Sequence, residues 1–408
     1  MNRTIIDIHV LQTVPPSNLN RDDTGTPKSA VYGGKRRARV SSQAWKRATR
    51  TAFSELLDPS ELGVRTKRVV EVLAERISVL DTLLSPAAAE ELAAETLATV
   101  TGVKLTVPKR RKGGGGDEAE SAPESTYLMF LSSRQFDALA ALTVEGASDG
   151  DLKTLKEFFK TRENKARARR SVDTGHSVDI ALFGRMVADS TDLNVDAAAQ
   201  VAHALSVHAV EVESDYFTAV DDTNTDAEMG AGMIGTVDFN SSTLYRYAAV
   251  DANRLQENLG GLSEDRTPSA DPTRRAVEAF LEGFITSLPT GKINTFGNHT
   301  LPAAVIVKLR TRRPISFVGA FEEPVETAEE GGFLRPSCER LATYVPELEK
   351  AFGLTDKGGT WVLRVGQDTE ALSSLGEELA LPELVTAVGA AVAARLKAGE
   401  SPQLEDGA

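Results

Sequence analysis

Residues 33–50 read GGKRRARVSSQAWKRATR, and they concentrate positive charge in a chain of 408 residues whose formal net charge is -13. The segment from Lys28 to Arg50 holds eight basic residues and no acidic one, whereas the rest of the chain holds 38 basic and 59 acidic residues. A basic strip on an acidic body binds a polyanion only where the strip lies, and salt weakens that binding. The stretch therefore indicates a local track for phosphate groups.

The second half of this stretch predicts a helix over residues 42–57, with Ser42 as its cap. Gln43, Lys46 and Arg50 lie at steps of three and four, so they share one face of the helix. The start of such a helix favours an anion through its unpaired amides and its dipole. The apolar residues form a stripe on another face, at Trp45, Ala48, Ala52, Phe53, Leu56 and Leu57.

The residues before the helix complete a cradle for a phosphodiester backbone. Gly33 and Gly34 let another chain approach the main chain closely, and Ser41 supplies a neutral hydrogen-bonding group. None of these groups selects a base, so we expect binding without sequence preference. The alternative is a solvated charged face, although such a face normally mixes both signs of charge.

Upstream, residues 4–11 predict a strand with one buried face, because Ile6, Ile8 and Val10 alternate with polar residues. Residues 12–40 contain several prolines and glycines and predict a long ordered loop. Loops of that length are usually functional or mobile.

Two adjacent carboxylates, Asp22 and Asp23, lie within this loop in LNRDDTG (19–25). Such a pair can bind a cation or assist hydrolysis. The alternative interpretation is a turn that Gly25 closes, with Asn20 nearby, in which both carboxylates are structural.

Downstream, the pattern predicts a mixed sheet covered by helices and interrupted by a helical insertion and a projecting hairpin. Residues 60–165 are predicted to be mostly helical, except for a flexible loop at 108–125 that contains four successive glycines at 113–116. The other expected elements are a buried strand (177–188), a hairpin arm (209–251), a helix (272–288), two strands (302–310 and 314–322) and a C-terminal helix (381–399).

Composition and motifs argue against several classes of protein. The chain is 41% hydrophobic and 26% charged, as is usual for a globular protein, and its one cysteine, Cys338, excludes an internal disulfide framework and fits a reducing cytoplasm. No stretch approaches the roughly 18 apolar residues of a membrane span, and the N-terminus is unlike a signal peptide. There is no GxxxxGK[ST] phosphate loop and no HExxH pair. His203 and His208, at a predicted helix end, make a poor metal pair, so we expect no metal and no cofactor.

The run IHVLQTVPPSNLNRDDTGTPKSAVYGGKRRARVSSQAWKRATR (8–50) closely resembles the start of the CasC-type backbone subunit of type I-E CRISPR Cascade. Later blocks resemble the same family in the same order. They are SVDIALFGRM (177–186), DYFTAVDD (215–222), FNSSTLYRYAAVD (239–251) and RLQENLGG (254–261). The resemblance covers most of residues 4–300, and it is looser over 60–165 and the C-terminal third.

The resemblance implies a hand-shaped, RAMP-like α+β fold, in which a modified RNA-recognition (ferredoxin-like) palm carries a helical fingers insertion and a hairpin thumb. It implies that several copies stack head to tail along one CRISPR guide RNA, together with other Cascade subunits, and leave bases free to pair with target DNA in antiviral defence. No membrane partner is implied. The implied division is palm 1–59, fingers 60–175, palm 176–208, thumb 209–240 and palm 241–408.

The resemblance also assigns site residues. The family's RNA-backbone positions include the helix face described above, Met186 matches a residue that packs against bases, Ile234 matches the apolar tip of the thumb, and Tyr216 and Phe217 lie at its base. The usual aromatic motifs of an RNA-recognition sheet are absent, so base stacking on the sheet is not expected. The predicted RNA-binding residues are Lys28, Ser41, Ser42, Gln43, Lys46, Arg50, Met186, Tyr216, Phe217, Ile234 and Lys292.

The leading hypothesis is therefore a non-catalytic scaffold that binds guide RNA without sequence preference. The alternative is a guide-dependent ribonuclease, because backbone subunits of related RNA-targeting complexes use a loop aspartate near this position, where Asp22 and Asp23 stand. A third hypothesis, a stand-alone metabolic enzyme, has no motif in its favour.

Overall fold

The computed structural model describes residues 3–107, 122–187, 193–219, 233–260, 270–329, 332–354 and 359–400. The predicted glycine loop at 113–116 lies outside these ranges, as does the end of the predicted arm, 220–232. Contacts divide the chain into two compact units. Unit 1 contains Met1–Phe53, Ala199–Ala252 and Val277–Ala408, and unit 2 contains Ser54–Ala198 and Asn253–Ala276.

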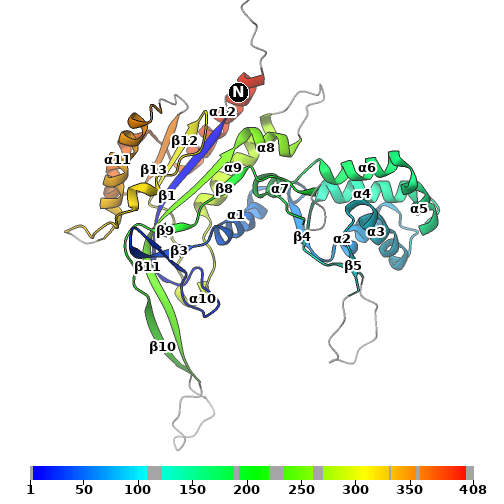
Figure 1. Cartoon of the computed structure of the whole chain (residues 1–408), viewed down its shortest axis with the longest axis horizontal. Coiled ribbons are helices and arrows are strands. Elements are labelled where there is room, and N and C mark those ends of the chain that lie inside the picture. Colours follow the sequence, from blue (N-terminus) through cyan, green and yellow to red (C-terminus); the bar gives the residue numbers. More distant parts are fainter. Residues whose placement is uncertain are drawn as a thin grey trace, which may run out of the picture. The chain divides into compact units, whose positions relative to one another are not determined.

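Unit 1 is built on a 10-stranded sheet (Figure 1). Its strands are β1 (Ile5–Ser17), β2 (Ser29–Tyr32), β3 (Lys35–Val40), β8 (Ala199–Val201), β9 (Ala204–Ser206), β10 (Glu213–Ala219), β11 (Met233–Asp251), β12 (Ala304–Arg310), β13 (Thr360–Arg364) and β14 (Glu377–Glu378). The hydrogen-bonded order is β14-β13-β12-β1-β11-β9-β3-β2, and β8 and β10 also pair with β11. Only β13 and β14 pair in parallel among these described strands, so the sheet is mixed and the predicted α+β class is confirmed.

Helices cover both faces of this sheet. They are α1 (Ser42–Leu56), α9 (Ala270–Thr286), α10 (Ile293–Phe296), α11 (Leu334–Ala351) and α12 (Leu381–Glu400), with the 3-10 helices η3 (Val318–Phe321) and η4 (Gln367–Leu375). On one face, Leu11, Tyr245 and Tyr247 share a core with Leu341 and Val345 of α11. No helix within the described ranges is long and apolar enough to cross a membrane.

The opposite face of the sheet packs against α1 and α9. Arg246 of β11 is fully buried there, with its guanidinium 3.7 Å from the ring centroid of Trp45 and 4.6 Å from that of Phe284. Its Nη1 donates to Gln12 Oε1 at 2.6 Å. Successive strand residues point to opposite faces, so Tyr245 and Arg246 lie in two different cores although they are neighbours in sequence.

The predicted single buried face of residues 4–11 is wrong, because both faces of β1 are buried. Asp7 lies on the second face, where Tyr247 Oη donates to its carboxylate at 2.8 Å and Arg310 forms an ion pair with it. Burial raises the pKa of Asp7, and the Arg310 charge opposes that rise.

His9 lies on the same face as Asp7. Its Nδ1 is 2.8 Å from Tyr245 Oη, and its ring stacks on Phe317 with the centroids 3.9 Å apart. Burial holds the pKa of His9 well below its usual value, so the ring stays neutral. Distant partners thus supply hydrogen bonds to the buried Asp7 carboxylate and to one ring nitrogen of His9, whereas His9 Nε2 has no partner among the described residues.

The predicted loop over residues 12–40 is also wrong in part, because strand structure continues to Ser17 and resumes in β2 and β3. Pro15 and Pro16 are tolerated because the pairing register of β1 shifts between Val14 and Ser17. Gly33 and Gly34 form the β2–β3 turn, with φ of 57° and 72°, a region that favours glycine.

The predicted strand at 314–322 is wrong, since it contains η3, and its Phe317 N–H donates at 2.8 Å to the Tyr245 hydroxyl on a sheet face. The predicted helices at 42–57, 272–288 and 381–399 are confirmed as α1, α9 and α12, and the strand at 302–310 is confirmed as β12. The arm is confirmed as β10 paired with the first part of β11.

Unit 2 is mostly helical, as predicted for residues 60–165. Its helices are α2 (Val69–Leu80), α3 (Pro86–Thr101), α4 (Ser133–Gly146), α5 (Leu152–Lys160), α6 (Arg162–Asp173), α7 (Val178–Phe183), α8 (Ala252–Leu259) and the 3-10 helix η1 (Pro59–Glu61). Two small antiparallel sheets of two strands each pair β4 (Gly63–Thr66) with β7 (Met129–Ser132), and β5 (Leu105–Thr106) with β6 (Glu124–Ser125). Its core includes Leu73, Leu92 and Leu139, from three helices.

The predicted buried strand at 177–188 is wrong, because its first part forms α7. A short apolar run cannot be assigned to strand or helix by periodicity alone. In the structure, the Asp179 carboxylate accepts hydrogen bonds from Gly63 N at 3.0 Å and Ser177 Oγ at 2.6 Å, which holds the first turn of α7 against β4.

Candidate nucleic-acid interface

Helix α1 begins at a cap that differs from the predicted one. Ser41, rather than Ser42, is the cap, because its Oγ accepts from Ala44 N at 3.3 Å. Ser42 is the first residue of the helix and is half-buried. The helix start therefore has its hydroxyl cap in place, and its amide end lies in unit 1 beside the loop that precedes β2.

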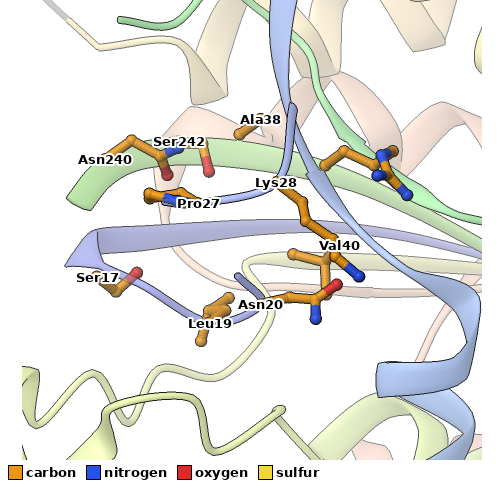
Figure 2. A pocket seen from close by; sticks show the side chains of 10 residues that line it. Ser17, Leu19, Asn20, Pro27, Lys28, Ala38, Val40, Asn240 and Ser242 are labelled. Carbon is orange, nitrogen blue, oxygen red and sulfur yellow. The ribbon is translucent and has the colours of Figure 1, made fainter. Parts of the chain in front are cut away.

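Asn20 joins that loop to the helix. Its Oδ1 accepts from Ser41 N at 2.9 Å, and its backbone oxygen accepts from Lys28 N at the same distance. Asn20, Lys28 and Val40 line one small pocket (Figure 2). The structure thus brings Lys28 and Ser41, which are 13 positions apart in sequence, to the two sides of one asparagine.

The two faces of α1 have different environments. Trp45, Thr49 and Phe53 are buried against the sheet and α9. On the other face Gln43 is exposed, and Lys46 and Arg50 are half-buried. Burial lowers the pKa of the Lys46 ammonium, so its charge is partly withdrawn from water. The structure therefore confirms that these predicted RNA-binding residues share one helix and one side of it.

Asp22 closes a turn in the loop. Its Oδ1 accepts from Thr24 N at 3.0 Å, Thr24 Oγ1 at 2.7 Å and Thr26 N at 3.1 Å. The Thr24 hydroxyl and the backbone amides hold the pKa of Asp22 below its usual value. Asp23 is exposed. Among the residues that the structure describes, no group of three or more His, Cys, Asp or Glu side chains could hold a metal ion.

The arm formed by β10 and the first part of β11 displays apolar side chains. Tyr216 is 60% exposed and Ile234 is 61% exposed. Ile234 pairs with Thr218, so it shares a face with Tyr216, whereas Phe217 lies on the other face. Phe217 stands opposite Gly235, and a Cβ on that glycine would lie 2.5 Å from the phenyl ring. The ring of Phe217 thus lies over position 235, where the absence of a side chain leaves room for it.

The base of the arm is tied to the loop that carries Asn20. The Asp238 carboxylate accepts from Thr26 Oγ1 and from Ser214 Oγ, both at 2.7 Å. Asn18 Nδ2 donates to the backbone oxygen of Asp238 at 2.9 Å. These bonds connect the arm to the segment that positions Lys28.

Lys292 stands at the start of α10 with φ 46°, the only positive φ of a non-glycine residue among the described residues. That conformation costs an ordinary residue about 1–2 kcal/mol. The preceding Gly291 lies against the loop, since a Cβ there would be 2.3 Å from Leu19 O. Lys292 is therefore held near the residues that flank Asn20.

Met186 belongs to unit 2, and its side chain is 86% exposed. The adjacent Arg185 is buried, and its Nε and Nη2 donate to Leu193 O at 2.6 Å and Val172 O at 3.0 Å. Burial lowers the pKa of Arg185 to about 10, which leaves the guanidinium charged at neutral pH. A buried arginine thus fixes the segment that presents an exposed methionine.

Three side chains have roles that the sequence pattern missed. Arg37 counts as basic in the sequence, but it is fully buried and donates to Ser206 O, Phe321 O and Glu322 O, so its guanidinium is not on the surface. Asn20 was predicted only as a turn residue. His203 is exposed between β8 and β9, not at a helix end, with its Nδ1 3.2 Å from Arg39 Nη1.

His208 has a structural role. Its Nε2 accepts from Thr243 N at 3.1 Å, and its ring stacks on Phe333 with the centroids 3.6 Å apart. The ring therefore ties the segment after β9 to β11.

Comparisons with known proteins agree with this arrangement. Residues 6–387 match the CT1975-like protein family, and no curated protein matches the chain. A chain of a solved structure described as "CRISPR RNA-guided surveillance complex, pre-nicking" is 33% identical, with a TM-score of 0.77 over 95% of this chain and 100% of that one. A chain of another, described as "CRISPR RNA-guided surveillance complex", is 30% identical, with a TM-score of 0.67 over 95% and 99%. These similarities confirm the resemblance to a CasC-type Cascade subunit, and the chain belongs to the CT1975-like protein family.

Proposed function

We propose that this chain is the guide-RNA-binding backbone subunit of a type I-E CRISPR Cascade. It binds the guide without sequence preference, polymerises along it, and presents it for pairing with target DNA. Its partners are guide RNA, other copies of the chain and other Cascade subunits. The observation that carries the proposal is the junction at Asn20, which places Lys28 beside the capped start of α1.

The geometry of this junction suits a phosphodiester backbone. A helix start favours an anion through its amides and its dipole, and Ser41 already caps this one. Lys46 and Arg50 follow at one-turn intervals on the same side. None of these groups is shaped to distinguish one base from another. The site therefore recognises the RNA backbone, and sequence is recognised by base pairing.

The proposal includes the hand-like division of the chain. In this division the sheet of unit 1 serves as the palm, an RNA-recognition-like sheet, the helices of unit 2 serve as fingers, and β10 with the first part of β11 serves as a thumb. Tyr216, Phe217 and Ile234 on the thumb, Met186 on the fingers and Lys292 beside the loop supply further contacts to the guide.

The proposed role is non-catalytic. The Asp22 carboxylate is occupied by three hydrogen bonds within its own turn, which supports a structural role. The alternative, a guide-dependent ribonuclease that uses Asp22 and Asp23, predicts specific cleavage of target RNA with added magnesium or manganese. It also predicts that the products vanish in Asp22→Ala or Asp23→Ala.

The test of the RNA track is the double variant Lys46→Ala/Arg50→Ala. Guide binding should weaken equally for all guide sequences, and the slope of log affinity against log salt should fall by about 1.4, which is two phosphate contacts at roughly 0.7 each. The control is Arg312→Ala/Arg313→Ala, which removes two exposed charges elsewhere in unit 1. An unchanged slope in a folded double variant would remove α1 from the RNA track.

A further inference from the structure

Two basic residues, Lys28 and Arg39, and the ionisable ring of His203 lie where the loop before β2, strand β3 and the β8–β9 connection come together. Arg39 N donates to Lys28 O at 2.9 Å, which holds these two residues side by side. The Arg39 guanidinium donates through Nε to Ser29 O at 3.2 Å, and its Nη1 is 3.2 Å from His203 Nδ1. Neither Arg39 nor His203 belongs to the predicted RNA-binding set.

The positive charges of Lys28 and Arg39 are not paired with an acidic group within the described residues. Within the described residues, no carboxylate lies within ion-pairing distance of Lys28 or Arg39. Both side chains line the small pocket that also contains Asn20. Both charges act on the ring of His203 and lower its pKa, so they lie within electrostatic reach of one place, and an anion bound there would interact favourably with both.

The hydrogen bond to Arg39 determines the state of the His203 ring. A guanidinium can only donate, so Nδ1 must accept, and the single ring proton is on Nε2. Partial loss of hydration, followed by the charges of Arg39 on β3 and Lys28 on the loop, lowers the pKa of His203 from its usual 6.5. The ring is therefore neutral at pH 7 in the unliganded protein.

We propose that Lys28, Arg39 and His203 form a binding site for one phosphodiester group of the RNA backbone, and that the site binds this group more tightly when His203 is protonated. The proposal rests on the proposed function and adds two residues and a proton to it. When His203 takes up a proton on Nδ1, it no longer accepts from Arg39, and both side chains become donors to the anion.

The sign of the pH effect follows from linkage. The two cations lower the pKa of His203 in the unliganded protein, and a bound phosphate raises it. Between these two pKa values, the complex holds more protons than the separate partners. RNA affinity therefore rises as pH falls through this interval, by at most about tenfold per pH unit for one proton, and it is constant outside the interval.

The first experiment measures guide-RNA affinity of the whole chain at pH 7.5 and pH 5.5 and at fixed salt. The wild type should bind about three- to tenfold more tightly at pH 5.5. In His203→Asn, the amide oxygen can still accept from Arg39, but the side chain cannot titrate, so the gain should disappear. The matched control is His299→Asn, which removes another exposed histidine and should keep the wild-type pH dependence.

The second experiment follows the imidazole resonance of His203 by NMR in protein with labelled histidine, assigned by its loss in His203→Asn. It is titrated alone, with tripolyphosphate and with guide RNA. A rise in the His203 pKa with RNA supports the site. A rise in the His203 pKa with tripolyphosphate but not with guide RNA would overturn the assignment of the site to the RNA backbone. Identical His203 titrations in all three samples would overturn the site itself.

Different results would contradict the proposed RNA-binding function and the proposed phosphate site. If the wild type binds no RNA at any pH, the proposed function is wrong. If it binds RNA with the same pH dependence as His203→Asn, only the site at Lys28, Arg39 and His203 is wrong.

Discussion

Helix α1 and the arm both carry predicted RNA contacts, but they are supported in opposite ways. The helix buries Trp45 and Phe53 completely, and Trp45 packs on the guanidinium of Arg246. The arm leaves Tyr216 and Ile234 more than half exposed. The helix is therefore fixed before any ligand arrives, whereas the arm has apolar surface that is open to contact with another molecule.

Strand β11 contains this contrast within one element. From Leu244 to Val250 it lies between β1 and β8 or β9 and is buried on both faces. From Ile234 to Asp238 it pairs with β10 alone. An isolated pair of strands is marginally stable at best. The same strand thus belongs to the stable core at one end and depends on partners at the other.

The largest expected effect distinguishes the two regions by stability. Trp45→Ala removes a fully buried ring from Arg246, and it should lower the free energy of unfolding by about 3–5 kcal/mol. Tyr216→Ala removes an exposed ring from the arm and should cost less than about 1 kcal/mol. Urea denaturation measures both. Equal losses in the two variants would mean that the arm is as firmly packed as the helix.

The next prediction concerns assembly on guide RNA, to which the arm should contribute although it adds little to the stability of the fold. Tyr216→Ala/Ile234→Ala strips one face of the arm, and loss of base stacking on an aromatic ring costs about 1–3 kcal/mol per base. Guide RNA should then be bound with about 5- to 150-fold lower affinity and less cooperativity. Phe352→Ala, which removes an exposed ring at the end of α11, is the control for the loss of any aromatic ring. Native mass spectrometry reports the number of copies per guide, and wild-type assembly by the double variant would contradict this role of the arm.

The smallest effect concerns the link between the two regions. Asp238→Ala removes the acceptor of the Thr26 and Ser214 hydroxyls, so backbone amides of β10 should exchange with deuterium faster while those of α1 do not change. The control is Asp215→Ala, an exposed carboxylate on the same arm. These hydroxyls hold the pKa of Asp238 below 3.8, so in the wild type the link persists above that pH and weakens as pH falls below it. Unchanged exchange in Asp238→Ala would show that the link does not restrain the arm.

Local patterns in the sequence predicted the helices well, because an apolar stripe such as that of α1 records which side of a helix is buried. They failed for β1, where Asp7 and His9 look like solvent-facing residues. Their burial depends on Arg310, Tyr245 and Tyr247, which lie more than 230 positions away in sequence and supply the missing hydrogen bonds and charge. No local pattern carries that information.

The candidate site was predictable to the same extent. Gln43, Lys46 and Arg50 could be placed together because helical spacing alone puts them on one side. Asn20 and His203 could not, because their importance lies in single hydrogen bonds to Ser41 and Arg39 from remote segments. Arg37 shows the opposite error, since its charge is used inside the protein to bind three carbonyl oxygens.

The pairing of Phe217 with Gly235 sets a rule for how this protein can vary during evolution. With the ring of Phe217 in its present position, a Cβ at position 235 would lie 2.5 Å from it, so a side chain there would require the ring to turn away. The two positions should therefore change together: relatives with an aromatic residue at 217 should keep glycine at 235, and those with a larger residue at 235 should have a small one at 217. The two positions are 18 apart in sequence, so such covariation would record the register of the two strands in the history of the family.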